Sequence, residues 1–161
     1  MNVEQAMTTG VKTCRPQDAL STAAHLMWDH DCGCVPVVDE KLKVLGIITD
    51  RDICMAAYTQ GKPLYELPVS LAMSKNVWSV RPGDTISAAE LVMQEHQIRR
   101  LPVVDVTGRL VGLLSLNDLA RHASRERTQK RKAVSDAEIG ETLAAICEAT
   151  GCQEAAAVSA A

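Results

Sequence analysis

The sequence predicts a mixed α/β (α+β) fold, in which two β-α-β-β-α units pack as one pseudo-twofold module followed by a C-terminal helix. The main observation is an internal repeat. When the chain is shifted by 66 positions, residues 7–57 overlay residues 73–123 without a gap, and sixteen positions are identical. Both copies combine β-rich runs with segments of helical periodicity. A unit of this size has only a marginal core of its own, so we expect the two copies to pack together.

The first part of each repeat is predicted to be a short extended stretch and then a helix. The extended stretches are residues 11–14 and 77–80, and each is followed by an Arg-Pro pair that breaks a helix. Asp18 and Asp84 are expected to cap the helices that come next. Apolar residues recur there at helical spacing. They are Leu20, Ala23, Ala24 and Met27 in the first copy, and Ile86, Ala89 and Met93 in the second.

The second part of each repeat is predicted to be a β-hairpin followed by another helix. Runs rich in valine and leucine flank turn-forming residues in both copies. The expected strands are residues 34–38 and 44–48 in the first repeat, and residues 101–104 and 110–114 in the second. The final helices are expected to open at Thr49 and at Ser115.

These elements divide the chain into four parts, namely repeat 7–57, linker 58–72, repeat 73–123, and a basic connector with a helical tail over 124–161. In the tail, Ser135 and the glutamate three residues later form a capping-box pattern. An apolar stripe follows, made of Ile139, Leu143, Ile146 and Cys147, and Gly151 is a natural stop. A single amphipathic helix must bury its stripe, so this one is expected either to cover the repeat core or to meet a partner chain.

Composition and charge argue against several classes of protein. Hydrophobic residues make up 47% and charged residues 23% of the chain, which is typical of a globular protein. There is no Phe and there are only two Trp and two Tyr, so aromatic platforms for nucleic acid are not expected. We find neither a membrane-spanning apolar run nor the features of a signal peptide. The six cysteines are therefore interpreted as reduced thiols in the cytoplasm.

The net charge of −3 is unevenly distributed. Residues 121–132 are strongly basic and residues 133–161 are acidic. We interpret the basic stretch as a solvated connector, while its attraction of phosphates, nucleic acid or a partner stays open as an alternative.

The clearest motif is a glycine-led strand that ends in a hydroxyl residue, with an aspartate three residues later. It occurs at residues 46–52 and again at 112–118. One interpretation is a helix capping box, in which the hydroxyl and the carboxylate satisfy free backbone N–H groups. The other is a ligand site, because a helix N-terminus attracts phosphate and an aspartate can accept hydrogen bonds from two ribose hydroxyls. The sequence leaves both open.

With the VPVVD and LPVVD runs, these motifs resemble a tandem pair of CBS (cystathionine β-synthase) domains, the Bateman module. The resemblance covers residues 7–123, about three quarters of the chain. It implies a regulatory module that binds adenosine-type ligands in clefts between the repeats and passes a conformational change to a protein partner. AMP, ADP and ATP are the most common ligands, and S-adenosylmethionine or NAD-type molecules occur in some members. It also implies a homodimer of CBS pairs without enzyme activity of its own.

The resemblance assigns roles to particular residues. Asp52 and Asp118 match the ribose-binding aspartate, and Thr49 and Ser115 match the hydroxyl residue that bonds ribose or phosphate. The other matching positions, which would meet the base or the phosphates, are Val11, Thr13, Cys34, Val35, Val77, Ser79, Arg100 and Leu101. With so few aromatics, we expect the adenine to be held mainly by aliphatic side chains such as Val11, Val35 and Leu101.

Arginines are expected to bind the phosphates, because guanidinium groups pair with them well. The candidates are Arg51, Arg99 and Arg100. A site containing Asp52 could borrow Arg99 or Arg100 from the other repeat, and the sequence leaves that pairing open.

The sequence contains no motif of a catalytic centre, and we predict neither catalysis nor a metal site. His30, Cys32 and Cys34 are residue types that bind metal, but no fourth ligand is evident nearby, so buried cysteines are the favoured interpretation. The alternative to a ligand sensor is a scaffold or oligomerisation module whose ligand clefts are vestigial.

Overall fold

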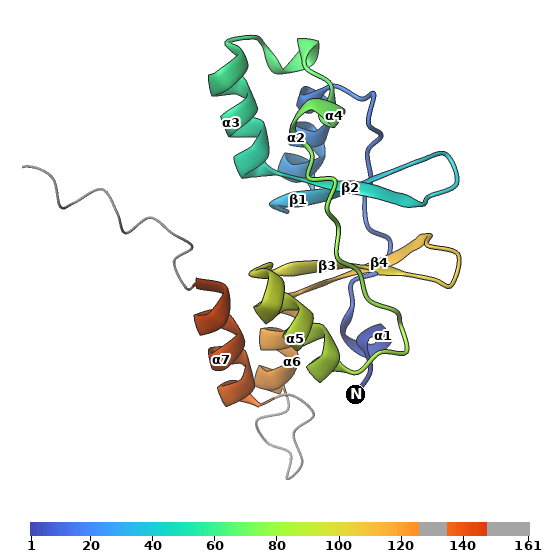
Figure 1. The fold of residues 1–161 in the computed structure, drawn as a ribbon, viewed down its shortest axis with the longest axis vertical. Helices are drawn as coiled ribbons and strands as arrows, with labels where there is room; N and C mark the ends of the chain where they lie inside the picture. Colours follow the sequence, from blue (N-terminus) through green and yellow to red (C-terminus); the bar gives the residue numbers. More distant parts are fainter. Residues whose placement is uncertain (126–134, 148–161) are drawn as a thin grey trace, which may run out of the picture.

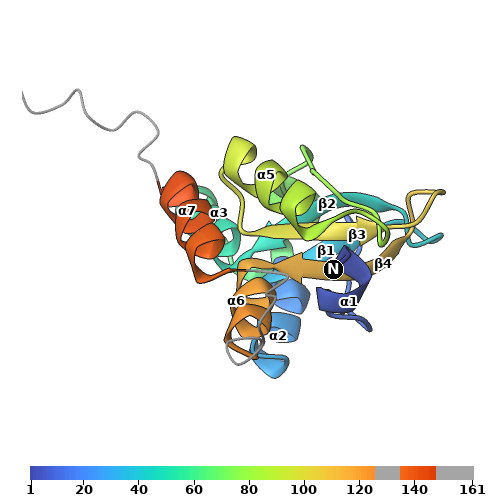
Figure 2. The ribbon, with the colours of Figure 1, turned by 90° about the horizontal axis from the view of Figure 1, so that it is seen from below.

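The computed structural model describes residues 1–125 and 135–147. Two antiparallel hairpins are stacked at its centre, with helices on the outer side of each (Figures 1 and 2). The first hairpin is β1 (Cys34–Val38) with β2 (Val44–Thr49), and the second is β3 (Arg100–Val104) with β4 (Leu110–Ser115). The predicted mixed fold of two similar units with a C-terminal helix is confirmed.

Two long helices flank each hairpin. The first repeat has α2 (Leu20–Asp29) and α3 (Asp50–Gln60), and the second has α5 (Ile86–His96) and α6 (Leu116–Arg125). Shorter elements, which the sequence did not predict, are α1 (Val3–Ala6), the 3-10 turn η1 (Leu64–Glu66) and α4 (Val69–Ala72). The last described helix is α7 (Asp136–Cys147).

The two hairpins share one register. Cys34 lies opposite Thr49 in the first, and Arg100 lies opposite Ser115 in the second. The repeat therefore places the residue that opens one strand beside the hydroxyl residue that ends its neighbour. The turns also join the repeats, because the N–H of Leu110 donates to the carbonyl of Leu42 at 2.9 Å.

The predicted first strands are wrong as regular elements. Residues 11–14 and 77–80 contribute only single parallel bridges, Cys14 to Val37 and Val80 to Val103. The reason lies in the facing strand. The N–H of Cys14 donates to the carbonyl of Pro36, but proline has no N–H with which to continue the ladder in the other direction.

The predicted aspartate caps are wrong as well. The carboxylates of Asp18 and Asp84 accept the N–H groups of Arg15 and Arg81, both at 2.7 Å. They close the turn at each Arg-Pro pair and lie one residue too early to cap a helix. Thr85 caps α5 instead, accepting the N–H of Ala88.

Each repeat core is completed by the segment that precedes the other repeat. Val3 of α1 is fully buried in the second core, and its N–H donates to the carbonyl of Asp84. Leu67 and Val69, from the segment predicted as a linker, are buried in the first core. Each of these segments also passes close to a hairpin strand of the other repeat, at Gly46 and at Gly112. Glycine is needed there, because a Cβ on Gly112 would lie 3.0 Å from the carbonyl oxygen of Thr8.

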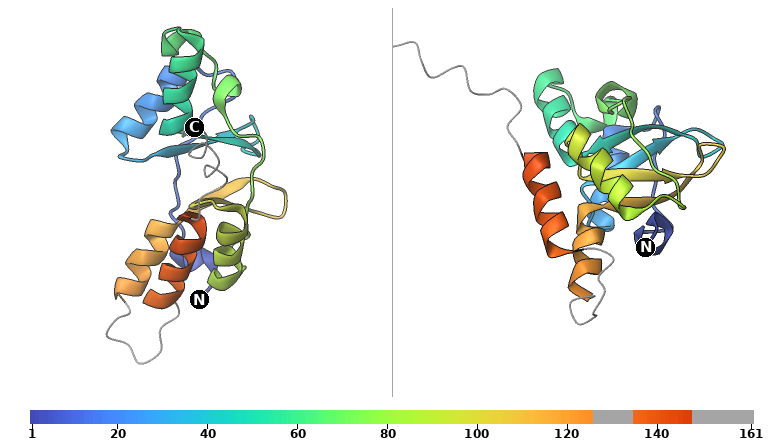
Figure 3. Two further views of the ribbon diagram at one scale, coloured as in Figure 1. Left: turned by 60° about the vertical axis from the view of Figure 1, so that its left-hand side comes forward. Right: turned by 60° about the horizontal axis from the view of Figure 1, so that its bottom comes forward.

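The tail helix covers the second repeat. Figures 1 and 3 show α7 alongside α5 and α6, and Ile139 and Ile146 pack into the second core. The predicted capping box is confirmed, since Glu138 accepts the N–H of Ser135 at 2.8 Å and the Ser135 hydroxyl accepts the N–H of Glu138. Of the two expected roles, α7 therefore takes that of covering the repeat core. Most of the basic connector, Gly151 and Cys152 lie outside the described residues.

None of the helices in the described ranges is both long and apolar enough to cross a bilayer.

Candidate functional site

A cleft of about 390 Å³ lies where the two repeats meet. Three parts of the chain form it: residues 8–12 near the N-terminus, the loop that leads into β1, and the β3–β4–α6 region of the second repeat. Its lining is mostly polar. The residues are Thr8, Gly10, Val11, Lys12, His30, Asp31, Cys32, Gly33, Cys34, Arg100, Leu113, Ser115, Asn117, Asp118 and Arg121.

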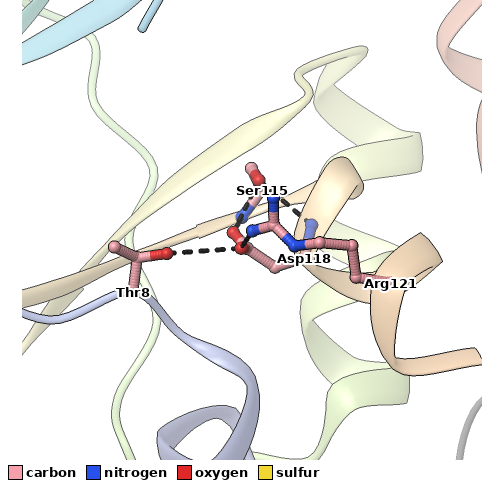
Figure 4. A network of polar contacts seen from close by, with 4 residues as sticks. All are labelled: Thr8, Ser115, Asp118 and Arg121. Atoms are coloured by element: carbon pink, nitrogen blue, oxygen red, sulfur yellow. Dashed lines mark hydrogen bonds and ion pairs between the residues drawn. The ribbon is translucent and has the colours of Figure 1, made fainter. Parts of the chain in front are cut away.

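Asp118 is the buried carboxylate of this cleft, with only 5% of its surface exposed. Its Oδ2 atom accepts the N–H and the hydroxyl of Ser115, at 2.8 and 2.5 Å. Its Oδ1 atom accepts the hydroxyl of Thr8 at 3.3 Å and is also paired with the guanidinium of Arg121 (Figure 4). The capping arrangement and the cleft thus involve the same carboxylate.

The cleft carries an excess of cationic side chains. Lys12, Arg100 and Arg121 line it, against the carboxylates of Asp31 and Asp118. Arg100 comes from the start of β3 and reaches over the loop of the first repeat, where a Cβ on Gly33 would lie 3.2 Å from its Nη2 atom. Together these cations favour an anionic group.

The equivalent motif of the first repeat, Thr49 with Asp52, does not line this cleft. Asp52 accepts the N–H and hydroxyl of Thr49 through Oδ2, at 2.9 and 2.7 Å, so its capping box is the same. Asp52 faces a separate hollow of about 230 Å³ between α3 and α4, shared with residues such as Leu71 and Ala72. No arginine lines that hollow. The two copies of the motif therefore sit in unlike surroundings.

The structure brings together five of the predicted site residues. Val11, Cys34, Arg100, Ser115 and Asp118 all line the cleft. Arg100 lines the cleft at Asp118 and does not line the hollow at Asp52.

The other predicted residues do not line this cleft. Val35 and Leu101 are fully buried in the two cores, and the expectation that their side chains hold an adenine stays a prediction. They alternate with outward-facing residues along their strands, and their side chains point into the cores. Thr49 and Asp52 belong to the first-repeat motif described above. Thr13, Arg51, Val77, Ser79 and Arg99 also lie outside the cleft.

Sequence reasoning missed Thr8, Lys12, Asp31, Asn117 and Arg121. Arg121 could have been predicted, because it follows Asp118 by three residues on one helix, and side chains at that spacing are neighbours. Thr8 had none, since it reaches Asp118 only through the crossing of the N-terminal segment.

Two buried thiols, Cys34 in the cleft and Cys14 in the first core, have raised pKa values. Burial raises the pKa of the Cys34 thiol to about 11, although the nearby Arg100 lowers it in part. Burial likewise raises the pKa of Cys14 to about 12. Within residues 1–125 and 135–147, no group of three or more His, Cys, Asp or Glu side chains is arranged to hold a metal ion.

Comparison with known proteins gives consistent matches over the repeats. The family model described as CBS domain matches residues 3–58 and 68–125. The "CBS domain-containing protein YhcV" of Bacillus subtilis is 41% identical over 119 residues, which cover 74% of this chain and 83% of that protein.

Two solved structures show the same arrangement with ligands bound. The CBS domain pair of protein MJ0100, in complex with 5′-methylthioadenosine and S-adenosyl-L-methionine, has a TM-score of 0.72 and 25% identity over 79% of this chain and 98% of that one. CBSX2 in complex with AMP has a TM-score of 0.68 and 25% identity over 77% of this chain and 96% of that one. Two adjacent family matches, on two units of one fold, leave a single conclusion. The chain belongs to the CBS domain family and contains a tandem pair of these domains.

Proposed function

We propose that this chain is a regulatory module that binds an adenine nucleotide in the cleft at Asp118, with AMP, ADP or ATP as the ligand. The observation that carries the proposal is the combination of Asp118 and Ser115 at the start of α6 with Lys12 and Arg100 in one cleft. A volume of about 390 Å³ lies within the usual range of small-molecule sites. Binding would shift the two repeats or two chains relative to one another, and a protein partner would read that shift.

Each part of a nucleotide has a candidate partner in the cleft. The carboxylate of Asp118 can accept hydrogen bonds from the ribose hydroxyls, and the hydroxyl of Ser115 lies beside it. The guanidinium of Arg100 and the ammonium of Lys12 can bind phosphate. Val11 offers an aliphatic surface for the base.

The charge of the cleft favours phosphorylated ligands over S-adenosylmethionine. The complexes of the neighbouring structures include both AMP and S-adenosyl-L-methionine, so the fold accepts either class in those proteins. In this chain, three cationic side chains line the cleft, and they would repel a sulfonium ion and attract a phosphate. NADH is included among the ligands of the titration below because it also carries phosphates.

The wider proposal is a cytoplasmic homodimer without catalytic activity of its own. The catalytic chemistry of any regulated process would then belong to the protein partner, and this chain would supply the sensor.

Isothermal titration tests the ligand assignment. We expect AMP or ATP to bind more tightly than S-adenosylmethionine or NADH, and Asp118→Asn to weaken the binding at least tenfold. Asp52→Asn is the matched control, because it changes the same motif outside the cleft and should leave the affinity within twofold. If none of the four ligands binds at millimolar concentration, the proposal fails and the scaffold alternative is favoured.

A further inference from the structure

The turns of the two hairpins lie side by side at one edge of the structure (Figure 1). An isolated antiparallel bridge between Lys43 and Arg109 joins the β1–β2 turn to the β3–β4 turn. A hollow of about 400 Å³ lies at this junction, and its lining residues are Asp39, Lys41, Lys43, Thr107 and Arg109. This turn pocket shares no residue with the cleft at Asp118.

The carboxylates near the turn pocket are occupied elsewhere. Oδ1 of Asp39 accepts two backbone N–H groups of its own turn, at 2.8 and 2.9 Å. Oδ1 of Asp105, the equivalent residue of the second repeat, accepts two N–H groups of its turn and the hydroxyl of Thr107. Glu40 pairs with Arg15. Within residues 1–125 and 135–147, the cationic side chains of the pocket therefore form no ion pair with a carboxylate.

The cations of the turn pocket repel one another. Lys43 and Arg109 are partners in an antiparallel bridge, and like charges at directly opposite positions destabilise such a pair. The stem of Lys43 also lies over the second turn, since a Cβ on Gly108 would lie 3.6 Å from its Cε atom. Lys41 adds a third positive charge to the same hollow. An anion bound between these groups would replace the repulsion with attraction.

We propose that the turn pocket binds an oligophosphate, meaning a small anion with two or more linked phosphate groups. Ammonium and guanidinium groups bind phosphate oxygens through charge-assisted hydrogen bonds, and Lys41, Lys43 and Arg109 supply three such groups. All three are exposed, so a ligand can reach them from solvent. Every lining residue is polar or charged, so the pocket suits a phosphate chain and offers no apolar surface to a nucleobase. Its volume of about 400 Å³ lies within the range of small-molecule sites.

The turn pocket belongs to both repeats. Its cations come from one turn of each repeat, so an oligophosphate that contacts Lys43 and Arg109 together holds the two hairpins against each other. The cleft lies at the opposite ends of the same strands, where β1 begins at Cys34 and β4 ends at Ser115. The turn pocket goes beyond the proposed function, because it does not depend on which ligand the cleft at Asp118 binds.

Isothermal titration of the full chain with inorganic tripolyphosphate tests the proposal. The turn variant, Lys43→Gln with Arg109→Gln, should bind it more weakly by about tenfold or more. The cleft variant, Lys12→Gln with Arg100→Gln, is the matched control, because it also removes one lysine and one arginine, and its affinity should stay within about twofold. An unchanged affinity in the turn variant, or an equal loss in the cleft variant, would overturn the proposal. Titration with AMP is a separate readout of the cleft, so failure of the proposed function and failure of the turn pocket can be distinguished.

Urea denaturation of the same chains checks the charge repulsion and shows whether the turn variant folds. At low ionic strength without phosphate, the turn variant should be at least as stable as the unchanged chain, because it has lost the opposed like charges. With millimolar tripolyphosphate the unchanged chain should become the more stable of the two, since a ligand of the folded state raises its stability. Sodium chloride at the same ionic strength is the control. An equal gain in stability with sodium chloride would mean that the anion only screens the charges, and it would overturn the proposal.

Discussion

The guanidinium of Arg121 pairs with Oδ1 of Asp118, the carboxylate that we assign to the ribose of a nucleotide (Figure 4). The hydroxyl of Thr8 donates to the same oxygen. Ribose hydroxyls must therefore compete with Arg121 for Asp118. The side chain of Arg121 is 61% exposed, so it can move into solvent at a cost of about 1 kcal/mol or less. In the proposed site, Arg121 would therefore hold the carboxylate in place until a ribose displaces it.

Arg121→Gln should bind adenosine more tightly than the unchanged chain. Adenosine has ribose hydroxyls but no phosphate, so removing the competing guanidinium helps its binding without a loss elsewhere. A pair worth up to about 1 kcal/mol corresponds to a gain of up to about fivefold in affinity. Isothermal titration with adenosine measures it. Arg81→Gln, an exposed arginine outside the cleft, should show no change. Weaker adenosine binding by Arg121→Gln would mean that Arg121 contacts the ligand directly.

The helices and hairpins could be predicted because their signals are local. The valine-rich strands and the capping pattern at Ser135 each depend on residues within one short window, and each of these elements is present. The predictions that were wrong concern contacts between residues far apart in sequence. Residues 11–14 look like a strand, but Pro36 of the facing strand limits them to one bridge. The short helix α1 buries Val3 in the core of the second repeat, a contact that no local pattern reveals.

The same distinction applies to the candidate site. Ser115 and Asp118 were predictable because their motif is contiguous and repeated. The unlike environments of Asp52 and Asp118 were not, since they depend on which segment crosses beside each motif. Thr8 reaches Asp118, whereas the equivalent Ser74 donates its hydroxyl to the carbonyl of Asn76.

Gly112→Ala and Gly46→Ala should both lower stability, but only Gly112→Ala should also weaken nucleotide binding. A Cβ at position 112 would lie 2.6 Å from Sδ of Met7 and 3.0 Å from the carbonyl of Thr8, so the N-terminal segment must move away from Asp118. At position 46 the clash is with Met73 and Ser74, away from the cleft. We expect a loss of about 1–3 kcal/mol in the free energy of unfolding for each.

Urea denaturation and titration with AMP measure the two effects. Gly83→Ala is the control, because a Cβ there would meet nothing within 4 Å, and its stability should change by less than about 0.5 kcal/mol. Equal loss of AMP affinity in Gly46→Ala and Gly112→Ala would contradict the role of the crossing segment in shaping the cleft.

Alkylation of the native chain should distinguish exposed from buried thiols. Cys54 and Cys147 are exposed, whereas Cys14 and Cys34 are buried with pKa values raised to about 12 and 11. Because the thiolate is the reactive form, iodoacetamide at pH 8 should modify the first pair and spare the second. Peptide mass spectrometry reports each site, and all four should react once the chain is unfolded in urea. Modification of native Cys34 at the rate of Cys54 would show that the loop before β1 opens.

The stability of the chain should fall as pH rises from about 4.5 to about 7, because of Glu90. This carboxyl is buried between α5 and α7, and its Oε1 atom has no hydrogen-bond partner. Burial, with a smaller contribution from the negative charge of Glu138, raises its pKa from 4.5 to about 7. In this window the folded chain keeps a proton that the unfolded chain has lost, so deprotonation favours unfolding. The effect is on the order of 3 kcal/mol, and it is complete about one pH unit above the raised pKa.

Urea denaturation at several pH values, compared between the unchanged chain and Glu90→Gln, isolates this contribution. Glu90→Gln should be the more stable of the two at pH 8, and the difference should shrink towards pH 5, where Glu90 is protonated in both states. Glu138 does not confuse the comparison, because its hydrogen bonds with Ser135 lower its pKa and its own titration lies below this window. Glu95→Gln, an exposed change on the same helix, should follow the unchanged chain. If the difference between Glu90→Gln and the unchanged chain is the same at pH 5 and pH 8, the carboxyl of Glu90 is not held protonated by its burial against α7.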